Sequence, residues 1–439
     1  MSGEPTNTLE LDMPVVVSRA SRLREQFERN VRAQFTNYLQ VFAGTGVRLG
    51  LQAVYFFILA NTLSLRDMGV FASTSATGIM IGCFSGLGFS SFAFRAAAGK
   101  RRALGGHLAV FYVSWLISLP LCLAASLPVF YLLFTTSLSL TAFLLIIVVE
   151  AGTWRIVEMI HQVNNGLGRY ASASLVISLG TALRTAGAVA FMASGKHDVE
   201  TWSAVYVIFN LAAMVLAVAV YQPRIKLRWR PSLFFGRMRD ALMFAIAYCA
   251  FISQNEIDKV VMLSLADQST VGIYAIASRI IDFTSVPIRT FYVLYSRKLI
   301  LEGRVHDKIG RSLGVEIMIA LISTIAFAGL LVVLSIWPTL LGHNVASATP
   351  LLAVLLAVPA FKNLLEYHSE LFFAYQRMTM RAVLATSQVA LKAGALALLL
   401  IYLDGIARWG AWLNTIYIGL YAISAAIVYR YVFGNEKNE

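Results

Sequence analysis

Two similar segments of the sequence lie about 200 residues apart: LSLRDMGVFA at residues 63–72 and LSLADQSTVGIYA at residues 263–275. Both begin with Leu-Ser-Leu, continue with an Asp, and end with Gly followed by an aliphatic residue, an aromatic residue and Ala. Each copy lies at the outer turn of the first apolar hairpin in its half of the chain. A repeat at the same point of both halves predicts two six-span bundles related by an axis along the membrane normal.

Apolar stretches of membrane-spanning length make up the rest of the chain. A hydrocarbon core about 30 Å thick requires about 20 residues of helix, and 58% apolar residues with 13% charged residues exclude a soluble domain of this length. The predicted fold class is therefore an all-α polytopic membrane protein, with about 12 transmembrane helices in two six-helix lobes around a central cavity. The predicted spans are 37–61, 69–95, 107–135, 140–163, 171–194, 201–221, 241–266, 270–296, 312–337, 349–375, 381–403 and 409–431.

The basic residues that give the chain its net charge of +13 are distributed in step with the predicted topology. Lys and Arg are frequent in both tails and in the even-numbered loops, whereas the odd-numbered loops hold only Arg66, Lys196 and Arg408. The positive-inside rule then predicts a multi-pass membrane protein with both termini in the cytoplasm. Because the basic residues are scattered over short loops, the lipid bilayer is the expected partner and nucleic acid is not.

The same pattern predicts the domain organisation. Apolar residues recur at every fourth position from Leu23 to Phe35, which favours an amphipathic helix on the cytoplasmic membrane surface. The predicted segments are a basic cytoplasmic tail with this helix (1–36), an N-terminal six-helix lobe (37–221), a basic linker (222–240), a C-terminal six-helix lobe (241–432) and a cytoplasmic C-terminal tail (433–439).

The sequence around the second repeat resembles a known family. Residues 256–280 read EIDKVVMLSLADQSTVGIYAIASRI, which is similar to the seventh and eighth spans of polysaccharide flippases, the Wzx family of the multidrug/oligosaccharidyl-lipid/polysaccharide (MOP) exporter superfamily. The twelve spans, two lobes and short basic tail also resemble that family over nearly the whole chain.

The resemblance implies a function and partners. The chain would move an undecaprenyl-pyrophosphate-linked oligosaccharide repeat unit across the plasma membrane, for cell-surface or exopolysaccharide biosynthesis, by alternating access of its two lobes. The implied partners are a polyprenyl-pyrophosphate-linked glycan and, beyond it, a polysaccharide polymerase and export machinery.

Ionised side chains inside the spans are the candidate functional residues, because each costs several kcal/mol there unless it faces water or a partner. Arg48, Arg184, Arg289 and Lys392 have no acid within one helical turn. They are therefore predicted to line a wet cavity and to bind pyrophosphate oxygens. Pairing across helices, or reaching a membrane interface, is the alternative for Arg184 and Arg289. Two further cations, Arg279 and Lys259, complete the predicted substrate-binding set.

Other charged residues have partners or neighbours at helical spacing. Local ion pairs are predicted for Arg155 with Glu158, Arg279 with Asp282, and Lys362 with Glu366. Two stripes of mostly charged residues are predicted, each along one face of a helix. An aromatic residue in such a stripe either stacks on a sugar ring or serves in packing. The stripes are Glu150, Trp154, Glu158 and His161 in span four and Lys362, Glu366 and Glu370 in span ten.

Three acids near the second repeat are candidates for ion coupling. Glu256, Asp258 and Asp282 would bind H⁺ or Na⁺, because a buried carboxylate can change its charge state during a transport cycle. Neutralisation of Lys259 and Arg279 is the alternative role for these acids. The sequence contains no nucleotide-binding motif, and no cofactor or metal is expected.

Two further functions remain open. A cation-coupled multidrug exporter of the same superfamily would have an acid in its first span or in its second lobe; the first span carries Arg48 and no acid, whereas spans seven and eight do contain acids. A membrane-embedded polysaccharide polymerase or ligase would need a sizeable external loop with catalytic polar residues. The short external loops offer only His197 and His343, so a transporter is expected rather than an enzyme.

Overall fold

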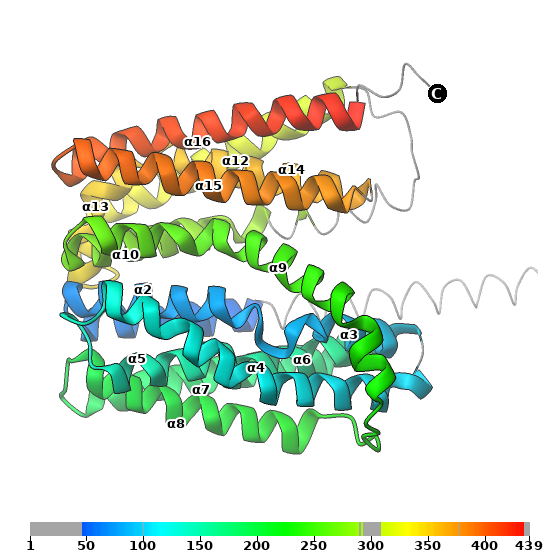
Figure 1. The fold of residues 1–439 in the computed structure, drawn as a ribbon. Coiled ribbons are helices and arrows are strands. Elements are labelled where there is room, and N and C mark those ends of the chain that lie inside the picture. The colour runs from blue at the N-terminus through cyan, green and yellow to red at the C-terminus, as the bar shows by residue number, and fades with distance from the viewer. Residues whose placement is uncertain (1–45, 100, 289–290, 293–308, 376, 434–439) are drawn as a thin grey trace, which may run out of the picture.

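The computed structural model describes residues 46–99, 101–288, 291–292, 309–375 and 377–433, and these residues form helices joined by short connections (Figure 1). The predicted tail helix at 1–36 and the candidate residue Arg289 lie outside the described residues. Seven of the described helices are long and apolar enough to cross a membrane, or nine if each of two bent helix pairs is one span. The all-helical membrane fold predicted from the sequence is confirmed.

The N-terminal lobe contains the first six predicted spans. The first of them is a helix at residues 46–62. The second is interrupted by glycine-rich sequence and bends by 50°. It consists of α2 (Leu65–Gly82), η1 (Ser85–Gly88) and α3 (Ser90–Gly99). The others are η2 (Arg101–Ala103) with α4 (Leu104–Leu133), α5 (Leu140–Ile147) with η3 (Val148–Thr153) and α6 (Trp154–Gly166), α7 (Tyr170–Ala193), and α8 (Val199–Leu216) with η4 (Ala217–Tyr221).

The C-terminal lobe begins with α9 (Pro231–Leu265). Pro231 occupies the first turn of this helix. A backbone N–H at this position has no acceptor within the helix, so its absence in proline costs no helical hydrogen bond. Because α9 begins before residue 241, the predicted linker at 222–240 is non-helical only over residues 222–230. The remaining elements are α10 (Gln268–Thr284), α12 (Ile309–Ile336), α13 (His343–Val354) with α14 (Val358–Ala374), α15 (Met378–Tyr402), and α16 (Ile406–Val428) with η5 (Tyr429–Phe433).

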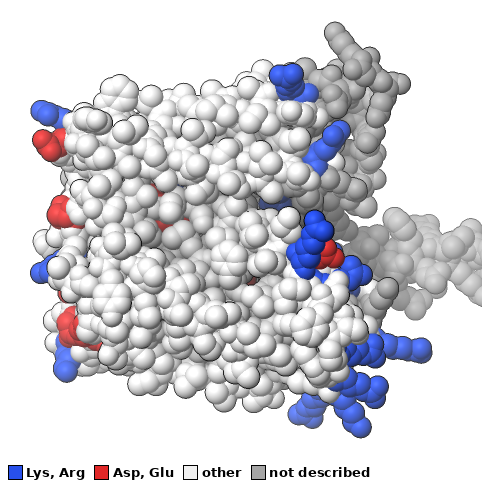
Figure 2. Space-filling view, viewed as in Figure 1, with Lys and Arg blue, Asp and Glu red and all other residues white. Residues whose placement is uncertain are grey.

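The two lobes lie side by side, with the blue-to-green helices in one half of the molecule and the green-to-red helices in the other (Figure 1). We call the end where α2 and α10 begin the motif end, because both repeats lie there, and the opposite end the basic end. Figure 2 shows most of the visible Lys and Arg at the basic end and most of the visible Asp and Glu at the motif end. Between the two ends this face is mostly white, with a few acidic atoms visible in the hollow between the lobes, and such a largely uncharged belt suits a bilayer.

The two repeats meet each other at the seam between the lobes. A Cβ atom added to Gly69 of α2 would overlap the carbonyl oxygen of Gln268, and one added to Gly272 of α10 would overlap that of Leu65. Glycine at both positions therefore allows the two helix backbones to touch. The sequence repeat thus marks the direct contact between the lobes.

Polar contacts close the same end of the seam. Arg66 Nε donates to Gln268 Oε1 at 2.5 Å, and Asn344 Nδ2 donates to the carbonyl oxygens of Ala60 and Leu63 at 2.8 Å each. Since these bonds join residues of the N-terminal lobe to residues of the C-terminal lobe, they hold the motif end shut.

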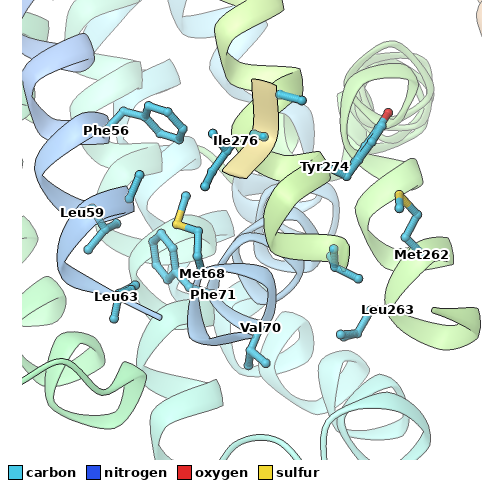
Figure 3. Close-up of a cluster of buried hydrophobic side chains, with 14 of the residues drawn as sticks. Phe56, Leu59, Leu63, Met68, Val70, Phe71, Met262, Leu263, Tyr274 and Ile276 are labelled. Carbon is cyan, nitrogen blue, oxygen red and sulfur yellow. The ribbon is translucent and has the colours of Figure 1, made fainter. Parts of the chain in front are cut away.

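An apolar cluster lies behind this seam. Phe56 and Leu59 of the first helix, Met68 and Phe71 of α2, and Ile276 of α10 point toward one another (Figure 3). All five side chains are buried and belong to one core cluster. The cluster packs between the lobes at the motif end.

Replacing Gly272 with Ala is expected to destabilise the protein by about 1–3 kcal/mol, the usual cost of overpacking. The new methyl group must push α10 away from Leu65 of α2. The measurement is the thermal unfolding midpoint in detergent. The matched control is Gly419→Ala in α16, where an added Cβ meets nothing within 4 Å, and this variant should be as stable as wild type. Equal midpoints for Gly272→Ala and Gly419→Ala would contradict the close contact of the repeats.

Candidate functional site

A cavity of about 280 Å³ lies between the two lobes. The N-terminal lobe lines it with the first helix, α2, η3, α6, α7 and α8, and the C-terminal lobe lines it with α9 and α10. On the first helix the lining changes from Leu59 and Phe56 near the motif end to Gln52 and Arg48 farther along. At 1.5 Å of rise per residue, this change extends over about 16 Å. The cavity is thus closed by apolar residues at the motif end and becomes charged toward the basic end.

The lining residues carry more positive than negative charge. Five of them are basic and three are acidic, a formal excess of two positive charges. The charged lining residues are Arg48, Arg155, Arg184, Lys259 and Arg279, together with Glu150, Glu158 and Glu256.

Glu150 lies on η3, a π-helical turn within the fourth span. Glu150 packs directly against Gly78 of α2. A Cβ atom added to Gly78 would lie only 2.9 Å from Glu150 Cβ, so glycine is what allows this close approach. The carboxylate accepts hydrogen bonds from Tyr206 Oη at 2.6 Å and from Ser75 Oγ at 2.8 Å. Three helices of the N-terminal lobe therefore fix one acid at the wall of the cavity.

Arg184 of α7 lies beside this acid. Its Nη2 atom is 3.8 Å from Glu150 Oε2, its Nε donates to Asn210 Oδ1 at 2.6 Å, and its guanidinium stacks 3.9 Å from the ring centroid of Trp154. Nη2 is buried and has no hydrogen-bond partner among the described residues. The predicted alternative of pairing across helices is thus correct for Arg184.

Arg155 and Glu158 of α6 form the predicted local pair, with 2.9 Å between Nη1 and Oε2. Arg155 Nη2 also donates to the carbonyl of Ile79 at 2.9 Å, while its Nε is buried without a hydrogen-bond partner among the described residues. From the other lobe, Tyr248 Oη of α9 donates to Glu158 Oε1 at 3.1 Å. This cluster joins the two lobes across the cavity.

The remaining cations differ in their pairing. Lys259 of α9 binds Glu256 of the same helix at 2.5 Å. Arg48 of the first helix and Arg279 of α10 line the cavity and form no hydrogen bond or ion pair within the described residues. These two half-buried guanidinium groups come from opposite lobes, and they account for the excess positive charge.

The structure corrects the prediction for Lys392. This side chain lies inside the C-terminal lobe, where Nζ contacts Asp258 Oδ2 at 2.9 Å and the carbonyl of Gln254 at 2.9 Å. Asp258 also accepts a hydrogen bond from Tyr274. Neither Lys392 nor Asp258 lines the central cavity. The sequence could not indicate this pair, because the acid that neutralises the lysine comes from a different helix.

The predicted local pair of Arg279 and Asp282 is also replaced. Arg279 makes no ion pair with Asp282, although the two residues are three positions apart on α10. Asp282 Oδ1 contacts Lys362 Nζ of α14 at 2.7 Å instead, and Asp282 does not line the cavity. Lys362 therefore has a partner on another helix.

Some residues at the cavity could be expected from the sequence and others could not. In the predicted stripe of span four, Glu150, Trp154 and Glu158 line the cavity, whereas His161 Nδ1 lies 2.8 Å from the carbonyl of Ala173. Sequence reasoning missed the tyrosines that line the cavity, because each lies on a separate helix and has no charge to mark it. These are Tyr55, Tyr206 and Tyr248.

Comparisons with known proteins give a fold. No family model matches the sequence, and no curated protein matches it. Among solved structures, the inward-facing conformation of a multidrug resistance MATE family transporter of the MOP superfamily is similar to this chain, with a TM-score of 0.68 and 14% identity over 90% of this chain and 99% of that one.

Two further solved structures are also similar. The outward-facing conformation of a multidrug resistance MATE family transporter of the MOP superfamily has a TM-score of 0.57 and 13% identity, over 92% of this chain and 97% of that one. The MATE multidrug transporter DinF-BH has a TM-score of 0.62 and 12% identity, over 90% of this chain and 94% of that one. The chain therefore has the two-lobed fold of these MATE transporters.

Replacing Lys392 with Met is expected to destabilise the protein by about 3–5 kcal/mol, because Asp258 would remain charged, buried and without its cation. Replacing Arg279 with Gln should cost less, because this side chain forms no hydrogen bond or close ion pair with described residues. The measurement is unfolding in detergent, followed by the fluorescence of the tryptophans. Stability should return in the double variant Lys392→Met/Asp258→Leu. Equal stability of the Lys392→Met and Arg279→Gln variants would refute the assigned pairing.

Proposed function

We propose that this chain is a flippase for an anionic lipid-linked saccharide, of the undecaprenyl-pyrophosphate class, in the plasma membrane. The observation that supports this proposal is the pair of unpartnered guanidinium groups, Arg48 and Arg279, which face one cavity from opposite lobes within the described part of the chain. A cation at this depth is costly unless it meets water or an anion. A bound pyrophosphate would supply that anion and would bridge the two lobes.

The chemistry of the cavity fits both parts of such a headgroup. Guanidinium groups grip phosphate oxygens with two parallel N–H bonds, and Arg155 and Arg184 add two more guanidinium groups to the lining of the same cavity. Trp154 and Tyr55 expose aromatic surface to the same cavity, and aromatic rings pack well against the apolar faces of sugars. The polyprenyl tail would stay in the bilayer.

The proposed mechanism is alternating access. The motif end is closed by the glycine contact, the Asn344 hydrogen bonds and the apolar cluster, so a headgroup would enter from the basic end. A volume of about 280 Å³ lies at the lower limit of ligand pockets, which span about 300–1,000 Å³. The lobes would therefore have to separate further before a complete oligosaccharide unit enters.

The proposal includes an orientation and an energy source. Positive-inside bias would place the basic end, with both termini, in the cytoplasm, where the lipid-linked unit would be taken up. An anion that moves outward from an inside-negative cell gains about 2.3 kcal/mol per charge per 100 mV. The candidate coupling acids Glu256, Asp258 and Asp282 each contact a lysine. A coupling H⁺ or Na⁺ would have to displace that lysine, so we favour the membrane potential as the driving force.

A multidrug exporter is the second candidate, favoured by the similarity of the fold to that of solved multidrug transporters. A cationic drug would need free acids. Each of the three acids in the cavity already lies beside a basic residue, at 2.5 to 3.8 Å, and the excess charge is positive. The electrostatics of the cavity therefore favour an anionic substrate.

Removing the two unpaired cations is expected to block flipping. Purified protein would be placed in liposomes that contain a fluorescent polyprenyl-pyrophosphate-linked saccharide, and access of the saccharide to an external quencher would be timed. The variant Arg48→Gln/Arg279→Gln should flip at least about ten-fold more slowly than wild type, since a lost charged hydrogen bond costs about 1.5–3 kcal/mol. Arg48→Lys/Arg279→Lys should keep part of the rate because it keeps the charges.

The matched control is Arg95→Gln/Arg239→Gln, which removes two exposed arginines outside the cavity and should flip at the wild-type rate. A flipping rate of the Arg48→Gln/Arg279→Gln variant equal to that of wild type would contradict the proposal. Efflux of a cationic dye by wild-type protein, with no flipping of the saccharide, would establish the exporter instead.

A further inference from the structure

A second pocket lies at the basic end of the N-terminal lobe and shares no lining residue with the central cavity. Its volume is about 520 Å³. Three connections that are distant in the sequence form its walls: η2 before α4, the turn from α6 to α7, and the segment from η4 to α9. Figure 1 shows the last of these below the start of α9 at the basic end.

The pocket collects positive charge without a counter-charge. Arg101, Arg169 and Arg224 each line it, one from each connection, and no acidic residue lines it within the described part of the chain. Arg101 Nη2 donates to the carbonyl of Leu167 at 3.2 Å, while Arg169 and Arg224 make no side-chain hydrogen bond or ion pair with described residues. Three like charges around one hollow repel each other, and a bound anion would relieve that repulsion.

The polar walls are held in place by their own hydrogen bonds. Asn164 Nδ2 donates to the carbonyl of Tyr221 at 3.1 Å, and Tyr112 Oη donates to Gln222 Oε1 at 2.7 Å. These bonds fix the end of η4 against α6 and α4. The hollow is therefore a formed part of the fold rather than a gap between loose side chains.

The first turn of α7 adds donors to the same pocket. Ser172 of this turn lines the pocket, and the N-cap residue, Arg169, makes no side-chain capping bond. The first backbone N–H groups of a helix have no partner within the helix and attract anions. Together with the three guanidinium groups, they match the oxygens of a phosphate group.

We propose that this pocket binds a phosphate group, and that an anionic phospholipid of the adjacent leaflet supplies it. The pocket lies where bilayer-spanning helices end, and the lining residue Val220 is 64% exposed, as a residue that contacts lipid would be. Basic pockets between helices on the cytoplasmic side of membrane proteins commonly hold lipid headgroups. Phosphate free in solution has the same chemistry and is the other possible source.

Binding can be measured directly on the full-length protein in neutral detergent, without any transport assay. Phosphatidylglycerol, phosphatidylcholine and inorganic phosphate would be titrated separately, with the thermal unfolding midpoint as the readout. Wild type should be stabilised by phosphatidylglycerol and not by phosphatidylcholine. The pocket variant Arg101→Gln/Arg169→Gln/Arg224→Gln should bind at least about ten-fold more weakly, because it removes the charged donors.

The matched control, Lys226→Gln/Arg228→Gln/Arg239→Gln, removes three exposed charges from the same end outside the pocket and should bind within about two-fold of wild type. A second variant, Ser172→Trp, fills the pocket but keeps every charge, and it should also lose binding. Equal losses in the pocket and control variants would overturn the proposal, since general attraction to a basic surface would then suffice. Stabilisation by inorganic phosphate alone, lost in the pocket variant, would assign the site to free phosphate, and no response to either ligand would refute it.

Discussion

The cost of an ionised group within a membrane governs where this chain places its charges. A buried charge is tolerated when an opposite charge or a hydrogen-bond network accompanies it, and the Lys392–Asp258 pair inside the C-terminal lobe meets that condition. Most charges at the interface between the lobes are paired in the same way. Arg48 and Arg279 have no such partner among the described residues, and both line the cavity between the lobes. These charges therefore gather at a place inside the bundle that offers room for a polar ligand.

The contacts between the lobes differ at the two ends of the molecule. At the motif end, Gly69 and Gly272 allow backbones to touch, and the cavity is sealed by apolar residues. At the basic end, α9 crosses onto the N-terminal lobe, where Phe234 stacks on Phe89 with 5.7 Å between ring centroids. A helix that belongs to the second lobe by sequence thus packs on the first lobe over its initial turns. This arrangement connects the lobes while leaving the charged part of the cavity between them.

Much of the fold could be predicted from the sequence, and the places where prediction failed have a local cause. Long apolar segments predicted the spans, and the repeated LSL segments predicted two lobes. The helix that contains the predicted span at 241–266 begins earlier, at Pro231; its first turns carry Arg237, Arg239 and Asp240 and resemble a loop in composition. The helices at the interface between the lobes are also less apolar, since part of each faces the polar cavity rather than lipid.

The sequence by itself determined the all-helical membrane class, the charge difference between the two ends, and pairs within one helix such as Arg155–Glu158, three residues apart. Only the tertiary structure decided which charges meet across helices. Lys392 and Asp258 are 134 residues apart, and Lys362 and Asp282 are 80 residues apart. Helical periodicity fixes the neighbours of a residue at three and four positions along its own helix. It leaves the rotation and depth of each helix against the next to packing, and these decide whether an arginine finds a carboxylate or faces an open cavity.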